Sequence, residues 1–250
     1  CITCLRNPAL GREKECEIHL TEKPETVLVA GGGIAGLEAA IILKKRGHDP
    51  ILCEATDTLG GQFLTAGEAP RKKEMKAAVI SMAKKAERLG VDIRMNTKVT
   101  PEMIEEIKPH TVMNAIGAES IIPPIPGVDK AFVKDSHDVL DGKAEVTGNV
   151  VVIGGGMVGM ETAEYLAEKG AKVSVLEMLP DICSDMGTTR KICMGEEIQK
   201  SGIIPVTSVK VTEIGDNVVI GEKDGEKVEF PCDAAVLAIG AKKRDGSALA

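Results

Sequence analysis

A glycine-rich segment occurs twice in this chain, at an offset of 123 residues (Gly31 to Gly154). Each copy follows four apolar residues, and each leads at the same spacing to a glutamate and then to an Ile-Gly-Ala sequence. The matching pairs are Gly31–Gly36 with Gly154–Gly159, Glu54 with Glu177, and Ile116–Ala118 with Ile239–Ala241. All these features rarely recur in register by chance. The chain is therefore predicted to contain two copies of one nucleotide-binding unit.

Each glycine segment has the spacing of a dinucleotide-binding turn. The apolar run before it indicates a buried parallel strand, and a helix begins at the glycines. The first glycine permits a tight turn, the second lets the backbone approach a pyrophosphate, and the third lets the helix pack closely on the strand. The helix N-terminus then faces the phosphates. The alternative is that the glycines merely end strands in a fold without a ligand, and the duplication disfavours it.

The predicted fold class is α/β, with two Rossmann-like dinucleotide-binding domains, each with a parallel sheet plus a small antiparallel sheet. The periodicity predicts helices at Leu37–Gly47, Lys73–Leu89 and Met160–Gly170. Further strands are predicted at Asp92–Met95, Lys98–Thr100 and Val236–Ile239, with antiparallel hairpins over Val209–Phe230.

The same pattern predicts the domain organisation. Ile121–Gly127 is rich in proline and indicates a crossing between domains, where a helix cannot run. We expect a linker at residues 1–23, the first nucleotide-binding domain at 24–122, the second at 148–241, and the start of a return to the first domain at 242–250.

Composition narrows the class of protein. A chain of 250 residues that is 43% hydrophobic can bury a substantial core in two domains. Its net charge of −7 and its 2% aromatic content disfavour a nucleic-acid partner. No apolar run approaches the roughly 20 residues that span a bilayer, so no membrane partner is expected. Seven cysteines, an odd number, without a secretion signal indicate a cytoplasmic protein.

The two units, the first with Gly60-Gly61 soon after its glutamate, resemble the two-dinucleotide flavoprotein reductases. In these enzymes the first unit holds FAD and the second holds NAD(P)H. By this resemblance, FAD is expected to contact Gly31, Gly33, Ile34, Ala35, Gly36, Glu54, Ala55, Gly61, Gln62, Val99, Ala115 and Gly117, the last three through backbone atoms. The nicotinamide cofactor is expected to contact Gly154, Gly156, Met157, Val158, Gly159, Glu161 and Glu177.

Two glutamates of the second unit are candidate contacts of the nicotinamide cofactor. The carboxylate of Glu177 accepts from a ribose 2′-hydroxyl but repels a 2′-phosphate, so we expect NADH rather than NADPH. Glu161 is a candidate near the nicotinamide. The alternative for Glu161 is an ordinary first-turn acid that favours the helix dipole.

Two segments make the resemblance more specific, namely Cys4–Glu13 and Leu59–Phe63. Both segments are similar to parts of the NADH:flavin oxidoreductases related to old yellow enzyme, which include 2,4-dienoyl-CoA reductase, enoate reductase and trimethylamine dehydrogenase. The resemblance implies a full-length parent in which Cys4 is the last ligand of a [4Fe–4S] cluster and a barrel domain binds FMN. It also implies that residues 1–23 are a remnant of the iron–sulfur segment and that the FAD domain lacks its C-terminal return segment.

The N-terminal cysteines leave alternatives open. On spacing alone, Cys1 and Cys4 are a redox pair, half a metal site or an accidental pair. A [4Fe–4S] cluster needs four thiolates, so we expect iron only in the full-length parent.

No catalytic side chain is predicted. No cysteine pair follows Gly60-Gly61, and the four histidines are isolated in the sequence and expected to be exposed. Hydride transfer between bound cofactors needs no protein nucleophile. The leading hypothesis is therefore a module that passes electrons from NADH through FAD toward the cluster and FMN of the parent. The alternative is a non-catalytic domain that binds ADP or FAD without turnover.

Overall fold

The computed structural model describes residues 4, 6–184 and 186–249, and Cys1 lies outside this range. The chain divides into two compact units. The first comprises the described residues within 1–67, 73–117 and 243–250, and the second comprises 68–72 and 118–242. Each unit combines a parallel sheet with helices, so the expected mixed α/β architecture is confirmed.

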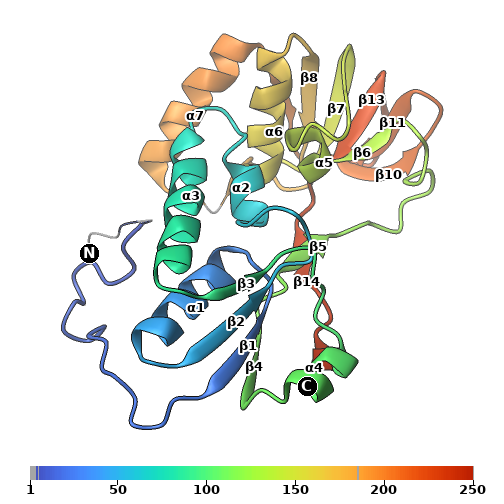
Figure 1. Cartoon of the computed structure of the whole chain (residues 1–250). Helices are drawn as coiled ribbons and strands as arrows, with labels where there is room; N and C mark the ends of the chain where they lie inside the picture. The colour runs from blue at the N-terminus through green and yellow to red at the C-terminus, as the bar shows by residue number, and fades with distance from the viewer. Residues whose placement is uncertain (1–3, 5, 185, 250) are drawn as a thin grey trace. The chain divides into compact units, whose positions relative to one another are not determined.

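The first unit is built on a four-stranded parallel sheet in the order β3-β2-β1-β4 (Figure 1). Its strands are β1 (Thr26–Ala30), β2 (Asp49–Cys53), β3 (Asp92–Arg94) and β4 (Thr111–Asn114). Its helices are α1 (Ile34–Lys45), α2 (Gln62–Ala66), α3 (Lys73–Arg88) and α4 (Pro101–Ile107), with a 3-10 turn η1 at Ser247–Leu249.

Alternating residues of β1 pack on opposite faces of this sheet, because successive side chains of a strand point to opposite sides. Val27 and Val29 pack in one buried cluster with Leu37 and Ile41 of α1. Leu28 and Ala30 pack in another cluster, which contains side chains of α4 and η1. The strand is thus buried on both faces, as its continuous apolar sequence predicts.

The second unit repeats this plan with a five-stranded parallel sheet in the order β6-β13-β7-β8-β9. Its strands are β6 (Val133–Asp135), β7 (Asn149–Ile153), β8 (Lys172–Leu176), β9 (Ile204–Val206) and β13 (Ala234–Leu237). Its helices are α5 (Ser136–Leu140), α6 (Met157–Glu168) and α7 (Thr188–Ser201). The pairing register repeats as well: Ala30 pairs with Cys53 in the first unit, and Ile153 pairs with Leu176 in the second.

The predicted hairpins form an antiparallel sheet in the second unit. Its strands are β10 (Lys210–Ile214), β11 (Val218–Lys223) and β12 (Glu226–Pro231). Val219 and Ile214 pack against Val151 and Leu237, whereas the other face of the parallel sheet packs against α6 and α7. A separate two-stranded sheet joins β5 (Ala118–Ser120) to β14 (Ala241–Lys243).

Three local expectations are wrong. Lys98–Thr100 forms no strand: Thr100 caps α4 through its hydroxyl, and Pro101 favours the first helical position that follows. Both glycine-turn helices begin three residues earlier than expected, at Ile34 and Met157, because the second glycine of each turn is itself the N-cap. Within the described part of the first unit no antiparallel sheet is found, since Asp92–Arg94 joins the parallel sheet instead.

The packing of α6 predicts a large effect of core truncation. Met160 is fully buried between α6 and the parallel sheet, whereas Met178 is 64% exposed. Met160→Ala leaves a cavity and is expected to lower the free energy of unfolding by about 2–5 kcal/mol. Met178→Ala is the matched control and should change it by less than about 0.5 kcal/mol. Urea denaturation of both variants measures the difference, and equal effects would contradict the described packing.

Candidate functional site

The first glycine turn follows β1 and is held by close backbone packing. Gly31 has a φ of +108°, and a Cβ there would overlap the carbonyl oxygen of Ala115. A Cβ at Gly36 would overlap the carbonyl oxygen of Gly31. These two positions therefore admit only glycine. Gly33 is different, because a Cβ there would meet no atom within 4 Å.

The second glycine turn, after β7, has the same geometry. Gly154 has a φ of +110°, and its added Cβ would lie 2.5 Å from the carbonyl oxygen of Ala238. A Cβ at Gly159 would overlap the carbonyl oxygen of Gly154. Gly156 again has open space, with nothing within 4 Å of an added Cβ. In both turns the protein's own packing requires the first and third glycines, while the middle one faces empty space.

The two predicted glutamates lie against the glycine turns in equivalent positions. Glu54 accepts the Gly32 N–H at 2.8 Å through Oε2, and the N–H and hydroxyl of Thr56 at 2.8 Å through Oε1. Glu177 accepts the Gly155 N–H at 2.6 Å and the Leu179 N–H at 2.8 Å. Each carboxylate is thus oriented by backbone N–H groups on two sides and sits beside the start of the helix.

The remaining residues predicted for the first turn are distributed around it. The Gly60 N–H donates to the Gly32 carbonyl at 2.9 Å, and a Cβ at Gly61 would lie 3.4 Å from the Cα of Gly33. This places Gly61, and Gln62 at the start of α2, next to the glycine turn. The exposed residues Ala35 and Ala55 flank the turn and its glutamate along the chain.

Two further predicted residues are engaged with the protein itself. Val99 is buried in the cluster that contains Leu28, so its side chain is committed to the core. Gly117, with a φ of +78°, accepts the Arg244 N–H at 3.0 Å. In the second turn, Met157 and Val158 are each 38% exposed at the start of α6, which leaves two apolar side chains open to solvent.

Glu161 lies in a buried ionic cluster. It is the fifth residue of α6 and only 8% exposed, and α6 has no acidic residue in its first turn. The alternative of an ordinary first-turn acid is therefore wrong. Its carboxylate forms an ion pair with the Lys72 ammonium and accepts from Arg190 at 3.2 Å.

The cationic partners of this cluster were missed by the sequence analysis. Arg71, next to Lys72, forms an ion pair at 2.8 Å with the buried carboxylate of Glu164. Burial raises the pKa of Glu164, and the positive charge of Arg71 opposes that rise. The sequence did contain a signal for such partners. Two glutamates three residues apart on an otherwise apolar helix face, Glu161 and Glu164, require cations when they are buried.

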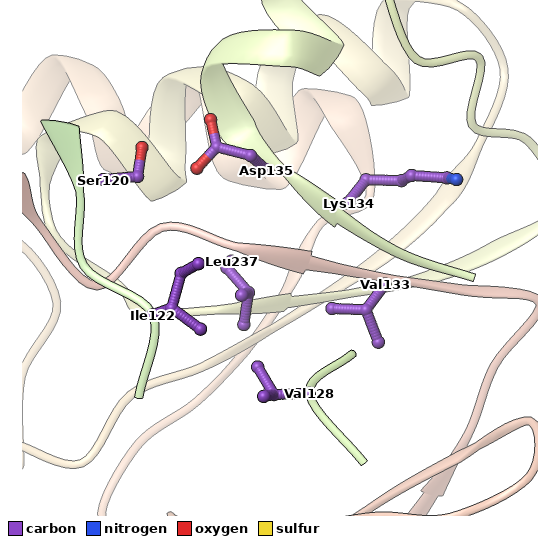
Figure 2. Close-up of a pocket in the computed structure, with 7 residues that line it drawn as sticks. All are labelled: Ser120, Ile122, Val128, Val133, Lys134, Asp135 and Leu237. Atoms are coloured by element: carbon purple, nitrogen blue, oxygen red, sulfur yellow. The ribbon is translucent and has the colours of Figure 1, made fainter. Parts of the chain in front are cut away.

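The second unit contains a pocket of about 310 Å³. Asp135 and its partners Ser120 and His137 form what we call its ionic rim. Figure 2 shows the oxygen atoms of Ser120 and Asp135 close together, above the apolar side chains of Ile122, Val128 and Leu237. The Nδ1 atom of His137 lies 3.1 Å from the Ser120 hydroxyl and 3.3 Å from Asp135 Oδ1. One ring nitrogen contacts both partners, which is not the geometry of a nucleophilic triad.

The expectation that the histidines are exposed is wrong for two of them, whereas His19 and His110 are exposed. His137 and His48 are half-buried, and His137 belongs to the ionic rim just described. The Nδ1 atom of His110 accepts the Thr26 N–H at 3.2 Å. The sequence pattern could not show the contacts with Ser120 and Thr26, because these residues lie far from His137 and His110 in the sequence.

Cys4, the predicted cluster ligand, is exposed, and its carbonyl accepts the Asn7 N–H at 3.3 Å. Within the described residues, no group of three or more histidine, cysteine, aspartate or glutamate side chains could hold a metal ion. The same part of the chain contains no helix with the length and apolarity needed to cross a membrane.

Residues 26–248 match the family model of the pyridine nucleotide-disulphide oxidoreductases. The chain belongs to this family. The match spans both glycine turns and both glutamates.

Several relatives and solved structures are similar over nearly the full chain. Bilirubin reductase of Mediterraneibacter gnavus and NADH oxidase of Thermoanaerobacter brockii are each 41% identical over 96% of this chain and 38% of their own length. The chain thus spans about two-fifths of the length of these relatives. A solved complex of 2-naphthoyl-CoA reductase with 2-naphthoyl-CoA superposes with a TM-score of 0.90, at 31% identity over 95% of this chain and 36% of that one.

The resemblance to reductases related to old yellow enzyme is confirmed. The multifunctional alkene reductase/demethylase OYE of Caballeronia cordobensis is 32% identical over 67% of this chain and 24% of its own length. The chain is therefore an oxidoreductase-family module that recurs within larger reductases.

The ionic rim predicts a defined pH dependence of stability. Burial raises the pKa of Asp135, but hydrogen bonds from His137 and Ser120 outweigh it and lower that pKa from 3.8 to about 2. The stabilisation is present above pH 4 and is lost as the pH falls through 2. The hydrogen bond to Asp135 raises the pKa of His137 above 6.5, so its share is lost as the pH rises through that higher value.

Asp135→Asn is therefore expected to lower the free energy of unfolding by about 2 kcal/mol between pH 4 and 6.5, and by less below pH 3. Denaturation of the parent and the variant across this range measures the difference. A constant difference from pH 2 to pH 8 would contradict the described pair. Asp233→Asn, which removes another strand-end carboxylate that accepts a backbone N–H, is the control for unspecific loss of an aspartate.

Proposed function

We propose that the chain is the FAD- and NADH-binding module of an oxidoreductase. The observation that carries the proposal is the open space at Gly33 and Gly156, each at the start of a helix and each beside an oriented glutamate. Packing gives no reason for glycine at these two positions, because a Cβ would meet no neighbouring atom there. A pyrophosphate that approaches the backbone supplies the missing reason.

The residues of the first turn fit FAD. The N-terminus of α1 presents backbone N–H groups, and its N-cap, Gly33, has no side chain to compete with phosphate oxygens. The carboxylate of Glu54 is placed to accept from the adenosine ribose. Gly61 and Gln62 lie on the side where the resemblance expects the flavin end of the cofactor, and Ala115 presents its backbone.

The residues of the second turn fit NADH. The N–H groups of Gly155 and Leu179 orient Glu177, and the carboxylate disfavours a 2′-phosphate. Met157 and Val158 offer exposed apolar contacts at the start of α6. Glu161 forms ion pairs with Lys72 and Arg190 and lies one helical turn beyond Met157, which keeps it a candidate near the nicotinamide.

When bound, the two cofactors supply the hydride donor and acceptor, and this chain supplies their position and electrostatic surroundings. The length of the relatives beyond the matched region supports a parent with further domains. We place the FMN-binding barrel there, with a [4Fe–4S] cluster that includes Cys4, and we expect a cytoplasmic enzyme. The organic substrate is chosen by the parts of the parent outside this chain.

Charge reversal at the two glutamates tests the assignment. Glu54→Arg is expected to weaken FAD binding at least tenfold, a loss of about 1.4 kcal/mol, and to leave NADH binding unchanged. Glu177→Arg should weaken NADH binding by a similar factor, improve NADPH binding and leave the flavin spectrum intact. Fluorescence titration measures FAD, NADH and NADPH binding. The opposite pattern would exchange the roles of the two turns.

Turnover is measured in the same samples as NADH-dependent reduction of an artificial electron acceptor by the FAD-loaded chain. Activity that is lost in both variants supports the electron-transfer function. Tight binding of both nucleotides with no turnover would instead indicate the non-catalytic binding domain.

A methyl group at the open glycine tests the ligand contact directly. Gly156→Ala introduces a Cβ that meets no protein atom, at a φ of −71°. We expect NADH affinity to fall about tenfold, while the free energy of unfolding stays within about 0.5 kcal/mol of the parent value. Gly195→Ala, on α7 and also with open space, is the matched control and should leave NADH affinity unchanged. Equal NADH affinity in both variants would remove the main support for this site.

A further inference from the structure

A second cavity, of about 830 Å³, lies within the first unit. Its walls come from one face of α1, one face of α3 and the N-terminal segment between Arg6 and His19. Its volume is in the range of sites that enclose organic ligands of moderate size. The glycines of the first turn are not among its lining residues.

The apolar part of this cavity is built from helix faces that the sheet does not use. Leu37 and Ile41 of α1 pack on the parallel sheet, whereas Ile34 and Ile42 face the cavity. The cavity-facing residues of α1 recur every three or four positions and so form one stripe along the helix. Met82 contributes the facing apolar surface from α3. Sheet packing alone therefore does not account for the second apolar face of α1.

The rim of the cavity is positively charged, although the chain carries a net charge of −7. Five of its lining residues are basic and two are acidic. The basic ones are Arg6, Arg12, Lys45, Arg46 and Lys85, and the acidic ones are Glu17 and Glu38. Within the described residues, the side chains of Arg6, Lys45, Arg46 and Lys85 form neither an ion pair nor a hydrogen bond, and Arg12 donates only to the Pro8 carbonyl.

We propose that this cavity binds an amphipathic carboxylate, an organic acid with an extended apolar body. The guanidinium groups of Arg6, Arg12 and Arg46 match the geometry of a carboxylate, and the ammonium groups of Lys45 and Lys85 add to the attraction. The apolar body lies against Ile42, Met82 and Ile34, the last of which is also an expected FAD contact. The site is additional to the two nucleotide sites, and its ligand need not take part in electron transfer.

Dodecanoate, used below its micelle concentration, is the probe, and isothermal titration calorimetry is the measurement. We expect one dodecanoate per chain, bound at least tenfold more tightly than dodecanol, which has the same chain without the charge. Lys85→Glu should weaken dodecanoate binding at least tenfold. Lys84→Glu is the matched control, because Lys84 is the neighbouring residue of α3 but does not line the cavity, and it should change the affinity less than twofold.

Four results would overturn the proposal. These are no dodecanoate binding, equal affinity for dodecanoate and dodecanol, equal effects of Lys85→Glu and Lys84→Glu, and displacement of dodecanoate by saturating FAD. The last result would make the cavity part of the flavin site. Circular dichroism of both lysine variants confirms that they fold as the parent does. Neither substitution removes an ion pair or a hydrogen bond to another described side chain.

Discussion

The contact between the end of a strand and the start of the next helix is the constraint on which the rest of each unit depends. At both turns the third glycine lies against the carbonyl oxygen of the first, with no room for a side chain. This approach fixes the direction in which the helix N-terminus points. It also sets the distance from the turn to the glutamate on the neighbouring strand, because that carboxylate accepts a turn N–H. The middle glycine has free space beside it. Its backbone is held in place by the close packing of the first and third glycines.

The repeated pattern made the two sheets and their glycine turns predictable from the sequence. A continuous apolar strand, a turn and a helix are local signals, and the offset between the copies also carried over to the strand register. The strand expected at Lys98–Thr100 failed because a threonine cap and the following proline favoured a helix start over β propensity. Local sequence rules favoured both a strand and a helix start here, and the Thr100 cap selected the helix start.

The contacts of the site were predictable where both partners belong to the motif and unpredictable where they do not. Glu54 and Glu177 lie beside the glycines as the spacing indicates. Lys72 and Arg190, which neutralise Glu161, come from a loop and a helix far away in the sequence. Only the fold brings such residues together. The same limit applies to His137 of α5, whose partner Ser120 lies on β5.

The assignment of residues 68–72 to the second unit has a consequence for how this protein can be divided. The chain passes from one unit to the other at four points, so the units are interlaced along the sequence and no single cut separates them. A piece that begins at Ala118 contains α6 but not Arg71 or Lys72. Glu161 would keep Arg190, but the buried carboxylate of Glu164 would lose its ion pair with Arg71, at a cost of about 3–5 kcal/mol for an unpaired buried charge. The loop at residues 68–72 therefore has to stay with the second unit wherever this chain is divided.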